Sequence, residues 1–171
     1  AVRLFDKGCV APLFWFIIAG LPGLFIYAGI VSLVWHVGKD GHSKGFGDVP
    51  GFLEFILGIV PSCLAALVLV LAALATPKVG FTRGLKSFFA TRGRAAYSEG
   101  GWPLMVAAWA LNVVLGGPVK DLAGVSVGRG WVGPQSAGAR VPADYLKRAL
   151  YLSAVAHLIT ASILALLLVY L

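Results

Sequence analysis

Apolar residues are grouped into long blocks along this chain. Residues 10–37 contain no Lys, Arg, Asp or Glu, and residues 52–75 contain one such residue, Glu54. Residues 145–171 carry two basic side chains near their start and none afterwards. An α-helix needs about 20 mostly apolar residues to cross the hydrocarbon core of a bilayer. The pattern therefore predicts three transmembrane helices over these three blocks.

The first of these helices is interrupted by Gly20, Pro22 and Gly23. Because proline removes a backbone hydrogen bond and glycine adds conformational freedom, we expect a kink or break there. A further apolar stretch, residues 102–115, is too short for a span and predicts a re-entrant or buried helix.

Residues 76–97 form a basic segment with five Lys or Arg residues, no acidic residue and several phenylalanines. This composition predicts an interfacial helix lying on the membrane surface, with a solvated cytoplasmic loop as the equal alternative. The predicted fold class is thus an all-α integral membrane protein. We expect a single membrane domain over residues 1–171, with three transmembrane helices, one short buried or re-entrant helix and this interfacial segment.

The composition supports the same fold class. Hydrophobic residues make up 59% of the chain and charged residues 12%, whereas soluble domains are about 45–50% apolar and about 25% charged. These values exclude a soluble enzyme, a disordered tail and a small disulfide scaffold. Cys9 and Cys63 lie in apolar blocks, so we interpret them as buried small hydrophobes.

The basic residues predict an orientation. The net charge is +7, and in a membrane protein such charge sets topology and attracts anionic lipid, so we expect a bilayer and no nucleic acid as partner. Residues 76–97 and 116–148 are basic, whereas residues 38–51 are neutral. If residues 102–115 do not cross, the basic segments and the N-terminus lie in the cytoplasm, while residues 38–51 and the C-terminus lie outside.

We expect the chain in the bacterial inner (cytoplasmic) membrane. The first apolar block lacks the small-residue cleavage site of a signal peptide. Whether residues precede Ala1 in the mature protein stays open.

Two ionisable residues inside the apolar blocks are candidates for function. Glu54 is either an acid at the membrane edge that takes part in chemistry or an acid that caps the start of its helix, and we favour the cap. His157 lies in the middle of the last block, where an ionisable residue suggests function. Because Ser153 and Ala161 share its helix face, we favour a neutral histidine packed at a helix interface.

Other polar motifs carry little chemistry. His36, Asp40, His42 and Asp48 are metal-ligand types, but their spacing matches no strong signature, and we predict no metal site. Residues 128–133 fit G-x-G-x-x-G, yet they lack the preceding strand and following helix of a dinucleotide site.

Short motifs occur along the chain in a specific order and spacing. They are Val10-Ala11-Pro12-Leu13-Phe14-Trp15-Phe16, Gly20-Leu21-Pro22-Gly23, Pro61, Gly101-Trp102-Pro103, Leu115-Gly116-Gly117-Pro118 and Trp131-Val132-Gly133. This set resembles the C-terminal part of the CobD/CbiB family of cobalamin biosynthesis, and the likeness extends to about Lys147. The resemblance implies a membrane adenosylcobinamide-phosphate synthase, which joins an aminopropanol unit to cobyric acid using ATP and a divalent metal.

The chain departs from that family at its polar positions. The family's Asn-Thr-Leu-Asp-Ser-Met is Val-Ser-Leu-Val-Trp-His at residues 31–36, and its Arg-Leu-Asp-Asp is Phe-Leu-Glu-Phe at residues 52–55, so only Glu54 keeps an acid. The family's Ser-Pro-Asn is replaced by Tyr-Ser-Glu at residues 97–99. The retained skeleton, which we expect to serve packing, comprises Pro12, Trp15, Gly20, Pro22, Gly23, Trp102, Pro103, Gly116, Gly117, Pro118 and Trp131, together with His157 in the last helix.

Three hypotheses remain. The main one is a catalytically degenerate relative that serves as a structural or accessory subunit of a membrane complex, with other membrane subunits as partners and no cofactor. The second is an active synthase that uses Mg²⁺ and ATP, with the residual candidates Glu54, Glu99, Ser98, Asp40, His36 and Arg129. The third is a sensor or regulator, since the fold also resembles a membrane signalling protein linked to β-lactamase induction. A corrinoid ligand stays open.

Overall fold

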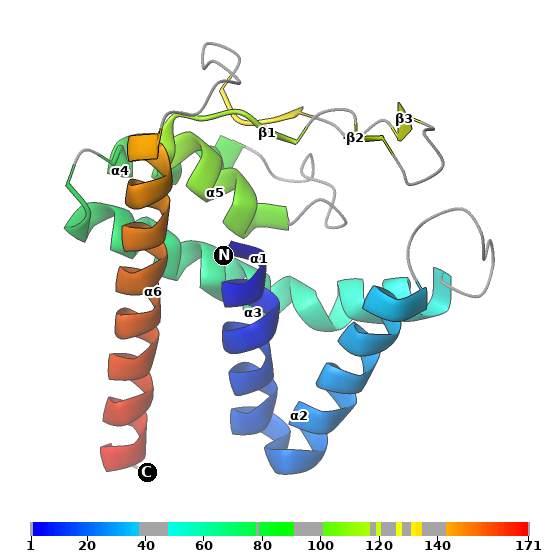
Figure 1. Cartoon of the computed structure of the whole chain (residues 1–171). Coiled ribbons are helices and arrows are strands. Elements are labelled where there is room, and N and C mark those ends of the chain that lie inside the picture. The colour runs from blue at the N-terminus through cyan, green and yellow to red at the C-terminus, as the bar shows by residue number, and fades with distance from the viewer. Residues whose placement is uncertain are drawn as a thin grey trace. The chain divides into compact units, whose positions relative to one another are not determined.

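The chain is largely helical (Figure 1). The computed structural model describes residues 2–37, 48–77, 79–90, 101–116, 119–120, 126–127, 131–134 and 143–170. Its elements are α1 (Val2–Phe5), the π-helical turn η1 (Asp6–Val10), α2 (Ala11–Val37), α3 (Asp48–Ala75), α4 (Phe81–Ala90), α5 (Gly101–Leu111), β1 (Leu115–Gly116), β2 (Val119–Lys120), β3 (Ser126–Val127), β4 (Trp131–Val132) and α6 (Ala143–Tyr170).

In the described part of the chain, three helices are long and apolar enough to cross a membrane, which confirms the predicted fold class. They comprise Val2–Val34, Val49–Ala75 and Asp144–Leu167. All three begin before the apolar blocks, because the polar residues at their starts continue the helix instead of ending it. Glu54 therefore lies beyond the first turn of α3, and the interpretation of Glu54 as a helix cap is wrong.

The predicted break in the first helix is confirmed at Gly20. Its backbone has φ 64° and ψ −155°, a region that is essentially accessible to glycine alone. In Figure 1 the two halves of α2 fold back on each other in a V, with Gly20 near the apex. A Cβ atom at Gly23 would lie 2.7 Å from the Trp15 carbonyl oxygen, so the close approach of the two arms also requires glycine there.

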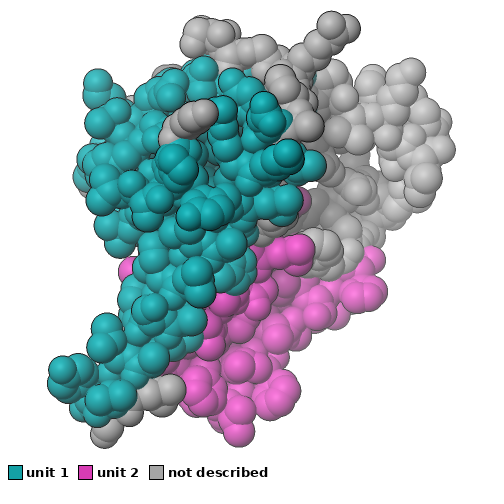
Figure 2. All heavy atoms as spheres, turned by 60° about the vertical axis from the view of Figure 1, so that its left-hand side comes forward, with its two compact units in different colours: residues 1–2, 66–171 teal, residues 3–65 magenta. Residues whose placement is uncertain are grey.

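The chain forms two compact units, which Figure 2 shows in different colours. Unit 2 comprises Arg3–Ala65, and unit 1 comprises Ala1–Val2 and Ala66–Leu171, so the boundary falls inside α3. Unit 2 contains the V of α2 and the first part of α3. In unit 1, α5 contacts α4, α6 and β4 and is buried along most of its length.

The short apolar helix is shorter than the predicted range 102–115. It ends at Leu111, because Asn112 adopts φ 55° and closes the helix in the left-handed conformation. The Val113 N–H donates to the Ala108 carbonyl at 2.9 Å and the Asn112 N–H donates to the Trp109 carbonyl at 3.2 Å. This is the Schellman pattern of helix termination. Gly116 thus lies beyond the end of the helix, in β1 (Leu115–Gly116).

Two short antiparallel strand pairs lie between α5 and α6 along the chain. Leu115 of β1 pairs with Val132 of β4, and Val119 of β2 pairs with Val127 of β3. The β1–β4 pair follows directly from the end of α5.

The basic segment contains a helix, α4, while residues 91–97 lie outside the described residues. Gly84 of α4 packs against Val106 and Ala110 of α5, and the Gly80 N–H donates to the Ala110 carbonyl at 2.9 Å. Its basic side chains at positions 83 and 86 are exposed. The interfacial position of this helix stays a prediction.

Alanine substitutions in α2 test the V. We expect Gly20→Ala to lower the free energy of unfolding by about 1–3 kcal/mol through backbone strain. Gly23→Ala should lower it by about 1–3 kcal/mol through overlap with the Trp15 carbonyl. Gly29→Ala is the matched control, since a Cβ there meets nothing within 4 Å. Unfolding in mixed detergent micelles measures all three, and equal behaviour at the three positions would contradict the V.

Candidate functional site

Two acids, a lysine and a serine are buried among the described residues of unit 2. Asp6 and Lys7 of η1 are 2% and 6% exposed, and Glu54 and Ser62 of α3 are 0% and 1% exposed. We call these four residues the polar cluster. Ionisable groups among apolar helices are costly, so each of them suggests a specific role.

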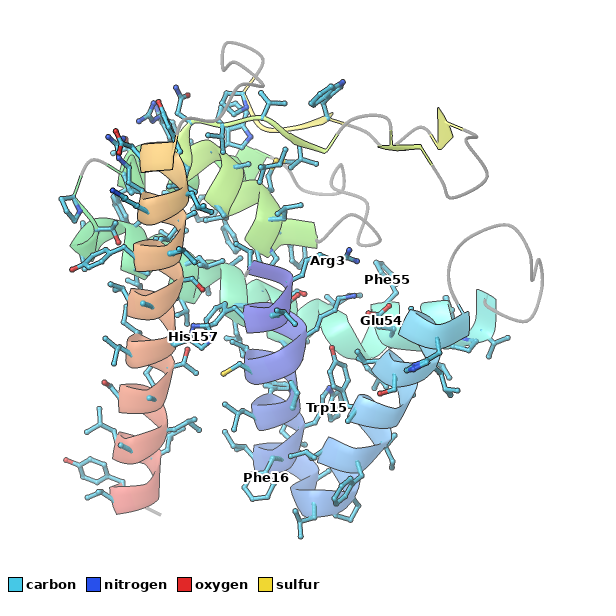
Figure 3. All side chains as sticks on the ribbon, in the orientation of Figure 1. Arg3, Trp15, Phe16, Glu54, Phe55 and His157 are labelled. Atoms are coloured by element: carbon cyan, nitrogen blue, oxygen red, sulfur yellow. The ribbon has the colours of Figure 1, made fainter. Side chains whose placement is uncertain are left out.

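The Lys7 ammonium forms an ion pair with the Glu54 carboxylate, donating to its Oε1 (Figure 3). Neither charge is accessible to water, because the two side chains are 5% and 0% exposed. Such pairs add little net stability when the cost of dehydration is included, but removing one partner leaves a buried uncompensated charge. The pair therefore fixes how η1 and α3 meet.

Asp6 contacts the same face of α3 two turns further on. The Ser62 hydroxyl donates to Asp6 Oδ2 at 2.7 Å. Residues 54, 58 and 62 are spaced by four, which places Glu54 and Ser62 on one face of the helix. Asp6 and Lys7 are adjacent in a π-helical turn, a rare geometry that is frequent at functional sites. Within the described part of the chain, Asp6 Oδ1 has no hydrogen-bond partner.

A third contact joins α2 to α3 below the polar cluster. The Trp15 indole N–H donates to the Leu57 carbonyl at 3.1 Å. In a regular helix that carbonyl would accept from the backbone of residue 61, but residue 61 is proline and has no N–H. The indole thus satisfies the carbonyl that Pro61 leaves without its helical donor. Figure 3 shows Trp15 between the two arms of α2.

Among the described residues, Glu54 is the predicted catalytic candidate that lies with other polar groups. Glu54 is part of the polar cluster, whereas Ser98, Glu99, Asp40 and Arg129 lie outside the described residues. His36 is exposed at the end of α2, and its Nδ1 lies 2.8 Å from the Ser32 carbonyl oxygen. His42, Gly117 and Pro118 also lie outside the described part.

The predicted packing residues have different environments. Pro103 is buried, Pro12 and Trp102 are half-buried, and Trp131 is 59% exposed. His157 is exposed, and its Nδ1 lies 2.7 Å from the Ser153 carbonyl oxygen one turn earlier. Its role at a helix interface stays a prediction. Cys9 and Cys63 are free thiols and half-buried.

Asp6, Lys7 and Ser62 were not among the site residues predicted from the sequence. Asp6 and Lys7 precede the first apolar block, where charges are expected to mark the membrane edge. A signal was nevertheless present, because Glu54 and Ser62 are eight residues apart and share a helix face. No pattern within one helix could indicate which residues of another helix face them.

Comparison with known proteins places the chain in a family. A model of the family described as CobD/Cbib protein matches residues 5–153. The chain belongs to the CobD/CbiB family. It is 32% identical over 127 residues to cobalamin biosynthesis protein CobD of Klebsiella pneumoniae, covering 74% of this chain and 39% of that protein. It is 32% identical over 135 residues to cobalamin biosynthesis protein CobD of Citrobacter koseri, covering 78% of this chain and 42% of that protein.

A third relative, cobalamin biosynthesis protein CobD of Brucella melitensis, is 34% identical over 128 residues, covering 66% of this chain and 35% of that protein. The chain thus spans less than half the length of these CobD/CbiB relatives. No solved structure matches it.

The buried acids of this CobD/CbiB-family chain do not fit a divalent metal. Mg²⁺ prefers carboxylate and water oxygens in open octahedral geometry. Glu54 already accepts from the Lys7 ammonium, whose positive charge opposes a metal ion, and Asp6 accepts from Ser62. No group of three or more His, Cys, Asp or Glu in the described ranges could hold a metal ion. Both acids bind a side chain of the facing helix.

A double-mutant cycle tests the ion pair. We expect Lys7→Met and Glu54→Gln each to lower the free energy of unfolding by about 3–5 kcal/mol, because each leaves a buried partner uncompensated. The double variant should lower the free energy of unfolding by less than the sum of the losses in the two single variants. Lys86→Met is the control, since Lys86 is exposed on α4. Additive losses in detergent unfolding would show that the two side chains do not interact.

A second cycle tests the indole contact. Trp15→Phe should lower the free energy of unfolding by about 1–3 kcal/mol, because the Leu57 carbonyl then lacks a donor. Pro61→Ala supplies a backbone N–H to that carbonyl. In the Pro61→Ala background, Trp15→Phe should therefore lower the free energy of unfolding by less than it does in the original chain. An equal cost in both backgrounds would mean that Trp15 acts through packing alone.

Proposed function

We propose that this CobD/CbiB-family chain is a catalytically degenerate membrane protein that serves as a structural or accessory subunit of a membrane complex. The state of Glu54 carries the proposal. Where the family's motifs at residues 31–36 and 52–55 have aspartate, Glu54 alone keeps an acid. Its side chain is fully buried and forms an ion pair with Lys7. A carboxylate in this state is occupied in holding helices together.

The apolar surface of the chain supports the same proposal. Large hydrophobic side chains are exposed along α2, α3 and α6, as in Phe25 at 67%, Leu74 at 67% and Leu158 at 68%. Such surface needs lipid or other membrane subunits to cover it. We place the protein in the bacterial inner membrane on the basis of its basic segments.

An active adenosylcobinamide-phosphate synthase is the second candidate. It is favoured by the names of the relatives, which are cobalamin biosynthesis proteins. Asp6 and Glu54 also favour it, since buried acids among membrane helices commonly mark functional sites. In that case the chain would use ATP, Mg²⁺ and a corrinoid, as the resemblance implies.

Native membranes provide the first test. After gentle solubilisation, native electrophoresis with mass spectrometry should find the chain in a large complex at fixed stoichiometry. Separation of inner and outer membranes before solubilisation tests the location. Migration alone or as a small homo-oligomer would contradict the subunit role.

An assay of the solubilised protein separates the two candidates. We expect no cobinamide formation from a corrinoid acid, an aminopropanol, ATP and Mg²⁺. ATP-dependent product that is lost both in Glu54→Gln and in the charge-neutral double variant Lys7→Met/Glu54→Gln would establish the synthase instead. The double variant distinguishes the loss of a catalytic acid from the effect of an unpaired lysine.

A further inference from the structure

The first membrane helix does not have the geometry of a single crossing. With 33 residues it is long and apolar enough to span a membrane. However, the backbone at Gly20 turns α2 back on itself. Figure 1 shows both ends of this helix at the open end of the V and the apex at the other end. All of these residues except Val2 belong to unit 2.

The apolar part of each arm is too short to cross a bilayer. Asp6 and Lys7 end the apolar part of the first arm, and His36 ends that of the second. Residues 8–19 and 21–35 remain, and at 1.5 Å per residue they rise about 18 Å and about 22 Å. The hydrocarbon core is about 30 Å thick, so neither arm is long enough to cross it.

Six large apolar side chains are exposed around the apex. The residues and their exposed fractions are Phe16 44%, Ile17 53%, Ile18 60%, Leu21 59%, Phe25 67% and Ile26 61%. Neighbouring helix positions point about 100° apart, so exposure of Ile17 with Ile18, and of Phe25 with Ile26, gives each arm a broad apolar face. Lipid chains can cover such a face along its whole width. In Figure 3, Phe16 points away from the second arm.

The polar contacts lie toward the opposite end of the V. Lys7 pairs with Glu54, and Asp6 binds Ser62, more than three turns before Gly20. Deeper in the V, the side chain of Tyr27 is 1% exposed, and Trp15 donates its N–H to Leu57. The buried groups therefore face the inside of the V, and the outer surface of the apex is apolar.

We propose that α1, η1 and α2 form a re-entrant hairpin, with its apex among the lipid chains and both arms opening on one side of the membrane. The ends of the two arms then lie on the same side. This differs from the orientation predicted from charge, in which the helix crosses once and the segment after it lies opposite the N-terminus. The inference does not depend on the proposed function.

Cysteine accessibility in the full chain tests the hairpin. In a Cys9→Ala/Cys63→Ala background, Leu4→Cys reports one arm end, His36→Cys the other, and Leu21→Cys the apex. A membrane-impermeant maleimide is applied to right-side-out and inverted vesicles. We expect the cysteines of Leu4→Cys and His36→Cys to react with maleimide from one side of the membrane only, the same side for both. The cysteine of Leu21→Cys should not react from either side. Reaction of the two arm ends from opposite sides would establish a single crossing.

The apex needs a second readout. A bimane label at Leu21→Cys, with Phe25→Cys as the alternative apex position, should be quenched by lipids that carry a nitroxide deep in the acyl chain. Maleimide reaction at the apex from the far side would mean two crossings. Absence of quenching would mean that protein covers the apex, and either result overturns the proposal.

Discussion

A polar group that is buried away from water needs a partner from protein, whether lipid or protein surrounds it. Lys7 with Glu54, Asp6 with Ser62, and Trp15 with the Leu57 carbonyl all obey this constraint. Each joins the first helix to α3. Apolar contacts cannot fix that register alone, because lipid chains are as apolar as the leucines they would replace.

The backbone follows the same constraint. A proline inside a membrane helix releases a carbonyl, and the helix tolerates it only where another donor is available. Trp15 provides that donor for α3, and the short distance from Trp15 to Gly20 determines how near α3 lies to the apex of the V. The break in α2 and the missing backbone hydrogen bond in α3 are thus coupled, since one arm of the broken helix carries the indole that binds the Leu57 carbonyl.

Much of the fold could be predicted from the sequence because apolar blocks of membrane length have few alternatives. The break at Gly20 was also predictable, since Gly20 and Pro22 act locally. Its angle was not, because a sharp reversal and a gentle kink have the same local sequence. The end of α5 was misplaced for a related reason: Asn112 takes the left-handed conformation that glycine usually provides. Asp6, Lys7 and Ser62 were missed because their roles depend on pairing between helices that lie far apart in sequence.

The residues that match the CobD/CbiB motifs are also the residues that hold unit 2 together. Trp15 and Pro61 belong to separate motifs of the resemblance, and one hydrogen bond explains why they occur together. Gly20 and Gly23 match for reasons of backbone conformation and close approach. The positions that differ from the family are polar ones, which these contacts do not use, apart from Glu54. An acid is retained at position 54 because Lys7 requires a counterion in an apolar setting. That requirement persists whether or not catalysis does.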